Sequence, residues 1–193
     1  MIKTTAMLLD ELKNYASPKT KLSRMVKNGE LFRVTKGIYE TDKGVSAHLL
    51  AGSIYGPSYI SFEYALSYYG MIPEAVYTVT SATYEKKKKK KYETPFGVFV
   101  YQDIPAEAYP FYLEVRREGD YWYRIASPEK AVCDQLYTLP PVKNRSELAY
   151  VLFNDMRMDE EEICRLNKDV VRELSAKYHS ANVRIFSSLL RRF

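Results

Sequence analysis

The sequence is poor in the residues that build metal centres and disulfides. Its 193 residues include two cysteines, Cys133 and Cys164, and two histidines, His48 and His179. Because the cysteines lie far apart and form no CxxC pair, neither a disulfide framework nor a Cys/His zinc site can be assembled from them. The shortage of histidine argues against a metalloenzyme with histidine ligands. We therefore expect no metal and no cofactor.

Long apolar runs are missing as well. No stretch approaches the ~18–20 apolar residues that span a bilayer. The N-terminal segment also differs from a secretory signal peptide. Its apolar run is short and is followed by Asp10 and Glu11, and it has no small-residue cleavage site. The composition, 46% hydrophobic and 27% charged, is typical of a folded soluble protein. These features predict a cytoplasmic protein without a membrane partner.

Catalytic motifs are incomplete. Gly52-Ser53 matches the Gly-Ser opening of nucleotidyltransferases, but no Asp-x-Asp follows it and only Glu63 lies at a suitable distance. That chemistry needs paired carboxylates to hold metal ions against nucleotide phosphates. Glu129 and Lys130 are adjacent, whereas a metal-dependent nuclease places the lysine two residues after the acid. No phosphate-binding glycine-rich loop occurs. We therefore predict that the protein is not an enzyme.

Basic charge is concentrated in two segments. The net charge is +5; residues 1–45 carry nine basic and five acidic residues, and residues 46–85 carry three acidic residues and no basic one. Six adjacent lysines then follow at Lys86–Lys91. A local cationic excess is typical of a surface that contacts a polyanion. The alternative for such a modest excess is an ordinary solvated surface. The arrangement of the basic residues must distinguish between these two interpretations.

The first segment predicts two short helices. Thr4 or Thr5 can cap a helix over 5–14. Ser17-Pro18 is a strong start for a second helix, because serine suits the N-cap and proline costs nothing at the first helical position. This second helix is expected to run from 18 to about 28 and to end at an Asn-Gly pair.

The second helix has two chemically different faces. Leu22, Met25 and Val26 form a narrow apolar stripe, and the remaining positions are basic or small and polar. Residues 31–39 then predict a β-hairpin with glycine in its turn and basic residues near its tip. Two close-set helices and a basic hairpin are typical of a minimal winged helix-turn-helix. The predicted DNA-binding residues are Lys19, Lys21, Ser23, Arg24, Lys27, Arg33 and Lys36. The alternative is a small helical cap whose lysines are merely solvated.

Residues 46–193 predict a second, larger domain of the α+β class. We expect a small, mostly antiparallel sheet with strands at 76–80, 96–101 and 121–125. Helices are expected at 46–55, at 62–69 with Ser61 as its cap, and from Pro128 to the Pro140-Pro141 break. A helical C-terminal tail follows, with helices at 146–156, 160–166, 168–178 and 181–192.

These segments together resemble a known family. The run from Ser17 through Met25-Val26-Lys27-Asn28-Gly29-Glu30-Leu31-Phe32 to Tyr39 resembles the DNA-binding segment of AbiEi-type antitoxins, from bacterial abortive-infection systems. Further matching segments follow in the same order, at Tyr59–Ser61, Glu63–Leu66, Tyr69–Pro73, Thr94–Tyr101 and Ile125–Tyr137. The most distinctive is Ala126-Ser127-Pro128-Glu129-Lys130-Ala131. The resemblance covers about residues 15–137.

The resemblance implies an antitoxin that also regulates transcription. Such a protein represses its own toxin–antitoxin operon by binding inverted repeats in double-stranded operator DNA, which places two protomers on the DNA. The partner is a nucleotidyltransferase toxin encoded by a neighbouring gene. The family is described as type IV, so neutralisation does not require a stable complex between toxin and antitoxin.

The lysine run is open to two interpretations. Six adjacent lysines repel one another, so we expect an exposed, mobile connection between two strands. Because Tyr84 and Tyr92 flank the run, its lysines could bind phosphates while a tyrosine ring stacks on a base. The candidate residues for this second nucleic-acid contact are Lys86, Lys87, Lys88, Lys89, Lys90 and Lys91. A plain solvated loop is the competing interpretation. The alternative function is therefore that of an RNA-binding or nucleic-acid-processing protein in which this loop is the main nucleic-acid-binding segment.

Overall fold

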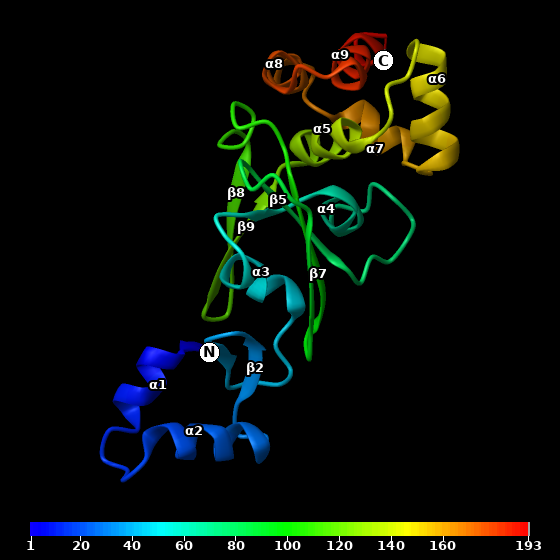
Figure 1. The fold of residues 1–193 in the computed structure, drawn as a ribbon. Helices are drawn as coiled ribbons and strands as arrows, with labels where there is room; N and C mark the ends of the chain where they lie inside the picture. Colours follow the sequence, from blue (N-terminus) through cyan, green and yellow to red (C-terminus); the bar gives the residue numbers. More distant parts are fainter. Residues whose placement is uncertain (193) are drawn as a thin grey trace.

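The computed structural model describes residues 1–192; Phe193, the last residue of the predicted larger domain, lies outside the described residues. The chain forms two β-sheets and a set of helices, so the α+β class is confirmed. Figure 1 shows the first two helices and a small sheet at one end, a larger sheet in the middle, and the C-terminal helices at the other end.

The small sheet comprises β1 (Ile2–Thr4), β2 (Phe32–Thr35) and β3 (Ile38–Glu40), in the order β1-β3-β2. Both pairings are antiparallel. The hairpin of β2 and β3 was predicted, whereas β1 was not. Two helices connect β1 to β2: α1 (Thr5–Glu11) and α2 (Pro18–Lys27).

The two N-terminal helices follow their local signals. The hydroxyl of Thr4 accepts the backbone N–H of Met7 at 3.3 Å and caps α1, which ends three residues earlier than predicted. α2 begins at Pro18 as predicted. Ser17 holds the N-cap position, but its hydroxyl pairs with that of Thr20 at 2.8 Å instead of accepting a backbone N–H. Gly29 takes a positive φ of 74° immediately after the helix, where a side chain would be strained.

The large sheet comprises β4 (Tyr59–Ile60), β5 (Val79–Thr83), β6 (Lys90–Thr94), β7 (Gly97–Asp103), β8 (Leu113–Glu118) and β9 (Tyr121–Ala126). Their order is β6-β7-β5-β4-β9-β8. The sheet is larger than predicted and is mixed, because β5 pairs with β7 and β4 pairs with β9 in parallel. Strand β5 also starts three residues later than expected, since its pairing with β7 begins at Val79. The preceding Tyr77 is 87% exposed.

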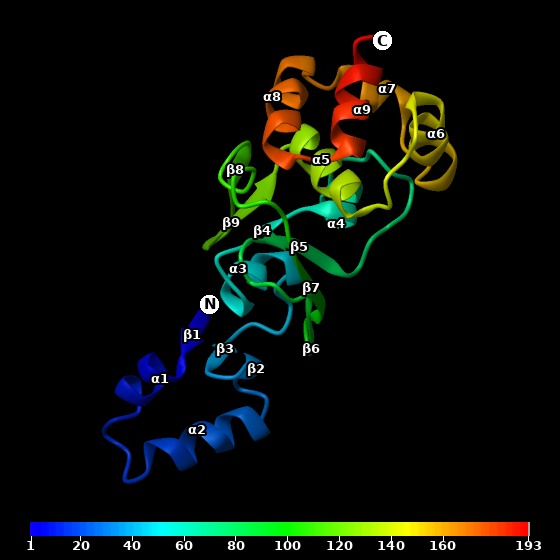
Figure 2. The ribbon, with the colours of Figure 1, turned by 45° about the horizontal axis from the view of Figure 1, so that its top comes forward.

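The C-terminal helices cover this sheet on the side away from α2 (Figure 2). Before the sheet come a 3-10 turn, η1 (Ala47–Leu50), and α3 (Ala51–Ile54), and α4 (Phe62–Tyr68) joins β4 to β5. In the described chain, five α-helices follow the sheet: α5 (Pro128–Thr138), α6 (Arg145–Tyr150), α7 (Glu160–Arg165), α8 (Lys168–Tyr178) and α9 (Ala181–Leu190). A short π-helix, η2 (Val151–Asp155), continues directly from α6. The predicted helical tail is thus confirmed, and its residues Val171, Leu174 and Phe186 belong to the main apolar core. Within residues 1–192 no helix has the length and apolarity to cross a membrane.

Ser61 was predicted to cap α4, and this is wrong in one respect. It holds the N-cap position, but its hydroxyl donates to the carboxylate of Asp134 at 2.5 Å. The backbone N–H of Tyr64 is bound instead by the hydroxyl of Thr80 on β5, at 3.1 Å. A partner from another strand therefore replaces the local cap.

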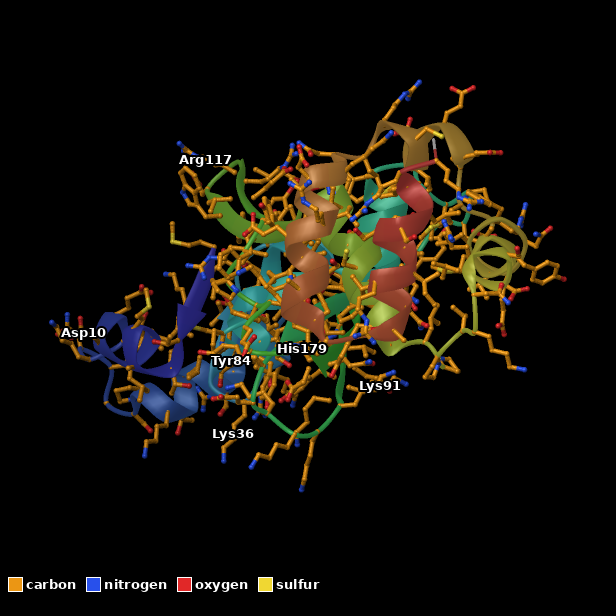
Figure 3. All side chains as sticks on the ribbon, turned by 90° about the horizontal axis from the view of Figure 1, so that it is seen from above. Asp10, Lys36, Tyr84, Lys91, Arg117 and His179 are labelled. Carbon is orange, nitrogen blue, oxygen red and sulfur yellow. The ribbon has the colours of Figure 1, made fainter. Side chains whose placement is uncertain are left out.

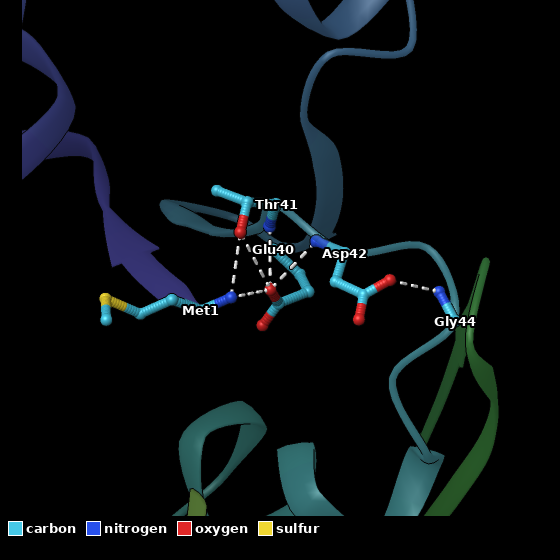
Figure 4. Close-up of polar contacts among 5 residues, drawn as sticks. All are labelled: Met1, Glu40, Thr41, Asp42 and Gly44. Carbon is cyan, nitrogen blue, oxygen red and sulfur yellow. Dashed lines mark hydrogen bonds and ion pairs between the residues drawn. The ribbon is translucent and has the colours of Figure 1, made fainter. Parts of the chain in front are cut away.

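The small and large sheets are joined at the end of β3. The buried carboxylate of Glu40 accepts the backbone N–H groups of Thr41 and Asp42 at 2.7 and 3.0 Å, and it also pairs with the amino group of Met1 (Figure 4). Burial alone would raise the pKa of Glu40, but these donors and the hydroxyl of Tyr121 on β9 lower it below its ordinary value. Glu40 thereby ties the end of the hairpin to the start of the chain.

Candidate nucleic-acid interface

Helix α2 rests on a small apolar cluster and turns its basic side to solvent. Leu22 is buried in this cluster with Leu8, Leu12 and Leu31, and Met25 and Val26 pack against it. At 3.6 residues per turn, the opposite side of the helix is centred on Thr20, Arg24 and Lys27. Lys19, Ser23, Arg24 and Lys27 are all exposed. The apolar stripe predicted for this helix is therefore the side that is packed.

Lys21 differs from the other predicted contacts. It lies at the edge of the exposed face and is half-buried, with its ammonium nitrogen 5.6 Å from the centre of the Tyr15 ring. A cation over an aromatic face is attracted by the ring quadrupole. The contact holds the Lys21 charge beside the turn that precedes α2, away from the centre of its basic side.

The hairpin adds two exposed basic side chains. Arg33 lies on β2, and Lys36 occupies the turn before Gly37, which takes a positive φ of 84°. The carbonyl of Gly37 accepts the backbone N–H of Thr5 at 2.9 Å. This bond fixes the hairpin turn against the start of α1. The turn is therefore short and anchored.

None of these basic residues is neutralised by a carboxylate. Within residues 1–192, no ion pair involves Lys19, Lys21, Arg24, Lys27, Arg33 or Lys36. The acidic residues of α1 are engaged elsewhere: Glu11 pairs with Lys3 at 2.7 Å, and Asp10 pairs with Lys13 at 3.3 Å. The positive potential of α2 and the hairpin is thus available to an external anion.

The lysine run is more ordered than the sequence predicted. Lys90 and Lys91 belong to β6, opposite Tyr101 and Val100 of β7, so the prediction of a wholly mobile connection is wrong. The carboxylate of Asp103 accepts the backbone N–H of Lys87 at 2.6 Å, which anchors the middle of the run. Pairing of β6 with a buried neighbour outweighs the mutual repulsion of its lysines.

Individual lysines of the run have different surroundings. Lys86 lies 5.5 Å from the centre of the Tyr55 ring, and Lys91 forms an ion pair with Glu93 at 2.7 Å. The side chains of Lys87, Lys88, Lys89 and Lys90 are exposed. Four of the six ammonium groups are therefore open to solvent and carry no ion pair within the described chain.

The two basic segments are neighbours in space. β2 of the hairpin contacts β6, which carries the end of the lysine run. Beside this contact, the ring of Phe32 on β2 meets the ring of Phe96, in the turn between β6 and β7, edge to face with centroids 6.3 Å apart. Figure 3 shows Lys36 and Lys91 along the same border of the molecule. The sequence predicted both segments but carries no signal for their contact, because it depends on how the two sheets pack.

A buried polar cluster lies apart from this surface. Lys130 and Asp134 are fully buried on α5, 3.4 Å apart, and the hydroxyl of Tyr178 accepts from Lys130 and donates to Asp134. Burial lowers the pKa of Lys130, and it raises the pKa of Tyr178 and of the adjacent Cys133 thiol. Because these groups are closed to solvent, they can stabilise the fold but cannot reach a substrate.

The described residues contain no group of three or more histidine, cysteine, aspartate or glutamate side chains placed to hold a metal ion. No protein-family model matches the chain, and a comparison with curated proteins gives no match.

Proposed function

We propose that this protein is a cytoplasmic DNA-binding antitoxin that represses its own toxin–antitoxin operon and has no enzymatic activity. One observation carries the DNA-binding part: α2 and the hairpin present exposed basic side chains that have no carboxylate partner within residues 1–192. Duplex DNA is the polyanion that an exposed helix of this kind fits, because the major groove admits one α-helix.

The order of the N-terminal elements supports a winged helix-turn-helix over residues 1–45. Strand β1, helices α1 and α2, and the hairpin β2–β3 follow one another, and β3 lies between β1 and β2 in the sheet. In such a unit the second helix enters the major groove and the hairpin lies beside it. α2 is then the recognition helix, and Arg33 and Lys36 extend the contact beside it.

The antitoxin part of the proposal rests on the family resemblance. It assigns residues 46–193 to the counteraction of a nucleotidyltransferase toxin, without requiring a stable complex. Inverted repeats in the operator would be bound by two protomers, because a symmetric site presents the same half-site twice.

The test of this function is binding to the DNA upstream of the protein's own gene. We expect tighter binding to that fragment than to a shuffled duplex of the same length, measured by fluorescence anisotropy at one fixed salt concentration. Repression of a reporter placed behind the same fragment should accompany binding. Equal affinity for both duplexes would contradict the proposal, because it would leave only non-specific attraction between charges.

The lysine run is proposed as a second phosphate-binding part of the same surface. We expect substitution of all six lysines, Lys86–Lys91, by glutamine to flatten the salt dependence of DNA affinity. The slope of log affinity against log salt should decrease by about 0.9 for each phosphate of B-DNA that the variant leaves without a cationic partner. The slope is measured from about 50 to about 200 mM salt, where the release of counterions dominates the change in affinity.

A control variant at a distant site replaces Arg165, Lys168 and Arg172 by glutamine. These three residues are exposed, and α7 and α8 lie at the other end of the molecule from α2 (Figure 1). Their replacement should leave the slope unchanged. If the lysine-run variant also keeps the full slope, the run is a solvated segment. If it loses RNA binding while operator binding is unaffected, the alternative of an RNA-binding protein is favoured.

A further inference from the structure

A cavity lies toward the edge of the large sheet that is opposite the lysine run. The sheet order places β6 at one edge and β8 at the other. The cavity, of about 470 Å³, opens between the β8–β9 hairpin and the segment that contains α3 and β4. In Figure 3, Arg117 of this hairpin lies on the opposite border from Lys36 and Lys91. The cavity is therefore separate from the surface proposed to bind DNA.

One wall of the cavity is an exposed aromatic ring beside a guanidinium group. Trp122 and Arg124 are two positions apart on β9, so their side chains lie on the same, exposed face of the strand. Two residues of a strand span about 7 Å. Trp122 is the one tryptophan of the sequence and is 65% exposed. The ring is therefore open to a ligand along this wall. The guanidinium of Arg117, on the neighbouring strand, lies 5.5 Å from the same ring.

The opposite wall offers small and polar groups. Gly52 has open space where a β-carbon would stand, so a ligand can approach its backbone closely. The exposed hydroxyl of Ser53 has no hydrogen bond within the described chain. His48 also lines the cavity, and its ring is held by the hydroxyl of Tyr64 at 3.2 Å and the carboxylate of Glu118 at 3.1 Å. The wall therefore combines free hydrogen-bonding capacity with room for a ligand.

The electrostatics of the cavity favour an anion. Among the described residues its lining contains no aspartate and no glutamate, and the Glu118 carboxylate beside it is paired with the His48 ring. Arg124 is exposed and forms no ion pair within residues 1–192; its charge acts on the Tyr109 hydroxyl, whose pKa it lowers against a larger increase from burial. An unpaired guanidinium suits a phosphate, because its planar fork matches phosphate oxygens.

We infer that this cavity binds a nucleotide, with its base stacked on Trp122 and its phosphate bound to Arg124. An aromatic platform beside a cation is the combination that holds base and phosphate in single-stranded nucleic-acid sites. The volume lies in the range of small-molecule pockets. A second hollow of about 210 Å³ shares Leu49, Ser53 and Trp122 with the first, reaches Ile2 of β1 and is also lined by Asp120. Because the Asp120 carboxylate repels phosphate, a free nucleotide in the first cavity is favoured over a single-stranded RNA that extends into the second.

Trp122 gives a direct readout of this binding in the full-length protein. Because the sequence has one tryptophan, its fluorescence reports on this cavity and on the hollow beside it. We expect saturable quenching on titration with ATP or GTP, or with a ten-residue oligouridylate, corrected for ligand absorbance and checked by calorimetry. Binding of the free nucleotides assigns the site to small molecules, and binding of the oligonucleotide alone assigns it to RNA.

Two variants separate the base from the phosphate. Arg124→Gln should weaken binding of ATP by ~10-fold and leave the weaker binding of adenosine unchanged. Trp122→Leu, measured by calorimetry, should weaken both ligands by ~10-fold. The control Arg172→Gln, which changes an exposed side chain of α8 at the far end of the molecule, should change neither.

The inference is overturned if neither nucleotides nor the oligonucleotide bind, or if Arg124→Gln weakens ATP and adenosine equally. It does not depend on the proposed operator binding. A variant of α2 that has lost DNA binding should quench normally, so failure of one proposal is distinguishable from failure of the other.

Discussion

Substitution of Asp134 by alanine should lower the free energy of unfolding by about 3–5 kcal/mol. The side chain is fully buried, and its carboxylate is the acceptor for three hydroxyls: Tyr59 at 2.9 Å, Ser61 at 2.5 Å, and Tyr178. Among the described residues it is also the one carboxylate that pairs with the buried ammonium of Lys130. Alanine would leave that charge without a counter-ion and the hydroxyls without an acceptor. Uncompensated burial of this kind is among the most destabilising single changes.

Chemical denaturation in urea measures the loss, with the m-value as a check on two-state unfolding. The double variant Lys130→Met/Asp134→Leu should be more stable than Asp134→Ala, because it removes both charges together. Arg172→Ala is the matched surface control, since its ion pair with Asp169 is exposed and should be worth less than about 1 kcal/mol. A loss below about 1 kcal/mol for Asp134→Ala would show that the cluster does not stabilise the core.

The parts of the fold that could be predicted are those with local signals. α2 and α5 both start at a Ser-Pro pair and begin at the predicted residue, because capping and proline geometry are set within one turn. The helix expected from residue 160 begins there as α7, where Asp159 accepts two backbone N–H groups as an ordinary N-cap. The packed side of α2 was also predictable, since its periodicity is visible in the sequence of the helix alone.

The parts that could not be predicted depend on contacts between distant segments. β1 has three residues and exists because β3 pairs with it, and Lys90 and Lys91 join a strand because β7 lies beside them. Ser61 has the ordinary signature of an N-cap, but Asp134, seventy-three positions away, takes its hydroxyl. The cavity at Trp122 has the same origin, because its two walls come from α3 and β9. No short-range pattern marks such sites.

The largest effect on function is expected from the double substitution Arg24→Ala/Lys27→Ala. Both residues lie at the centre of the exposed side of α2 and make no ion pair within the described chain. Alanine is a good helix former, so the variant should keep its fold. If α2 occupies the major groove, removal of these two cations should weaken binding to the protein's own upstream DNA by about 100-fold. Anisotropy titration at fixed salt measures this change.

The control Arg165→Ala/Arg172→Ala removes the same charge from α7 and α8 and should bind the operator like the parent protein. This comparison separates a specific contact from a general decrease in positive charge, because long-range attraction depends on the total charge of the protein and a groove contact does not. Full operator binding by Arg24→Ala/Lys27→Ala would contradict the assignment of α2 as the recognition helix. Since its exposed basic side chains are the main physical support for DNA binding, the lysine run and an RNA ligand would then be the stronger hypothesis.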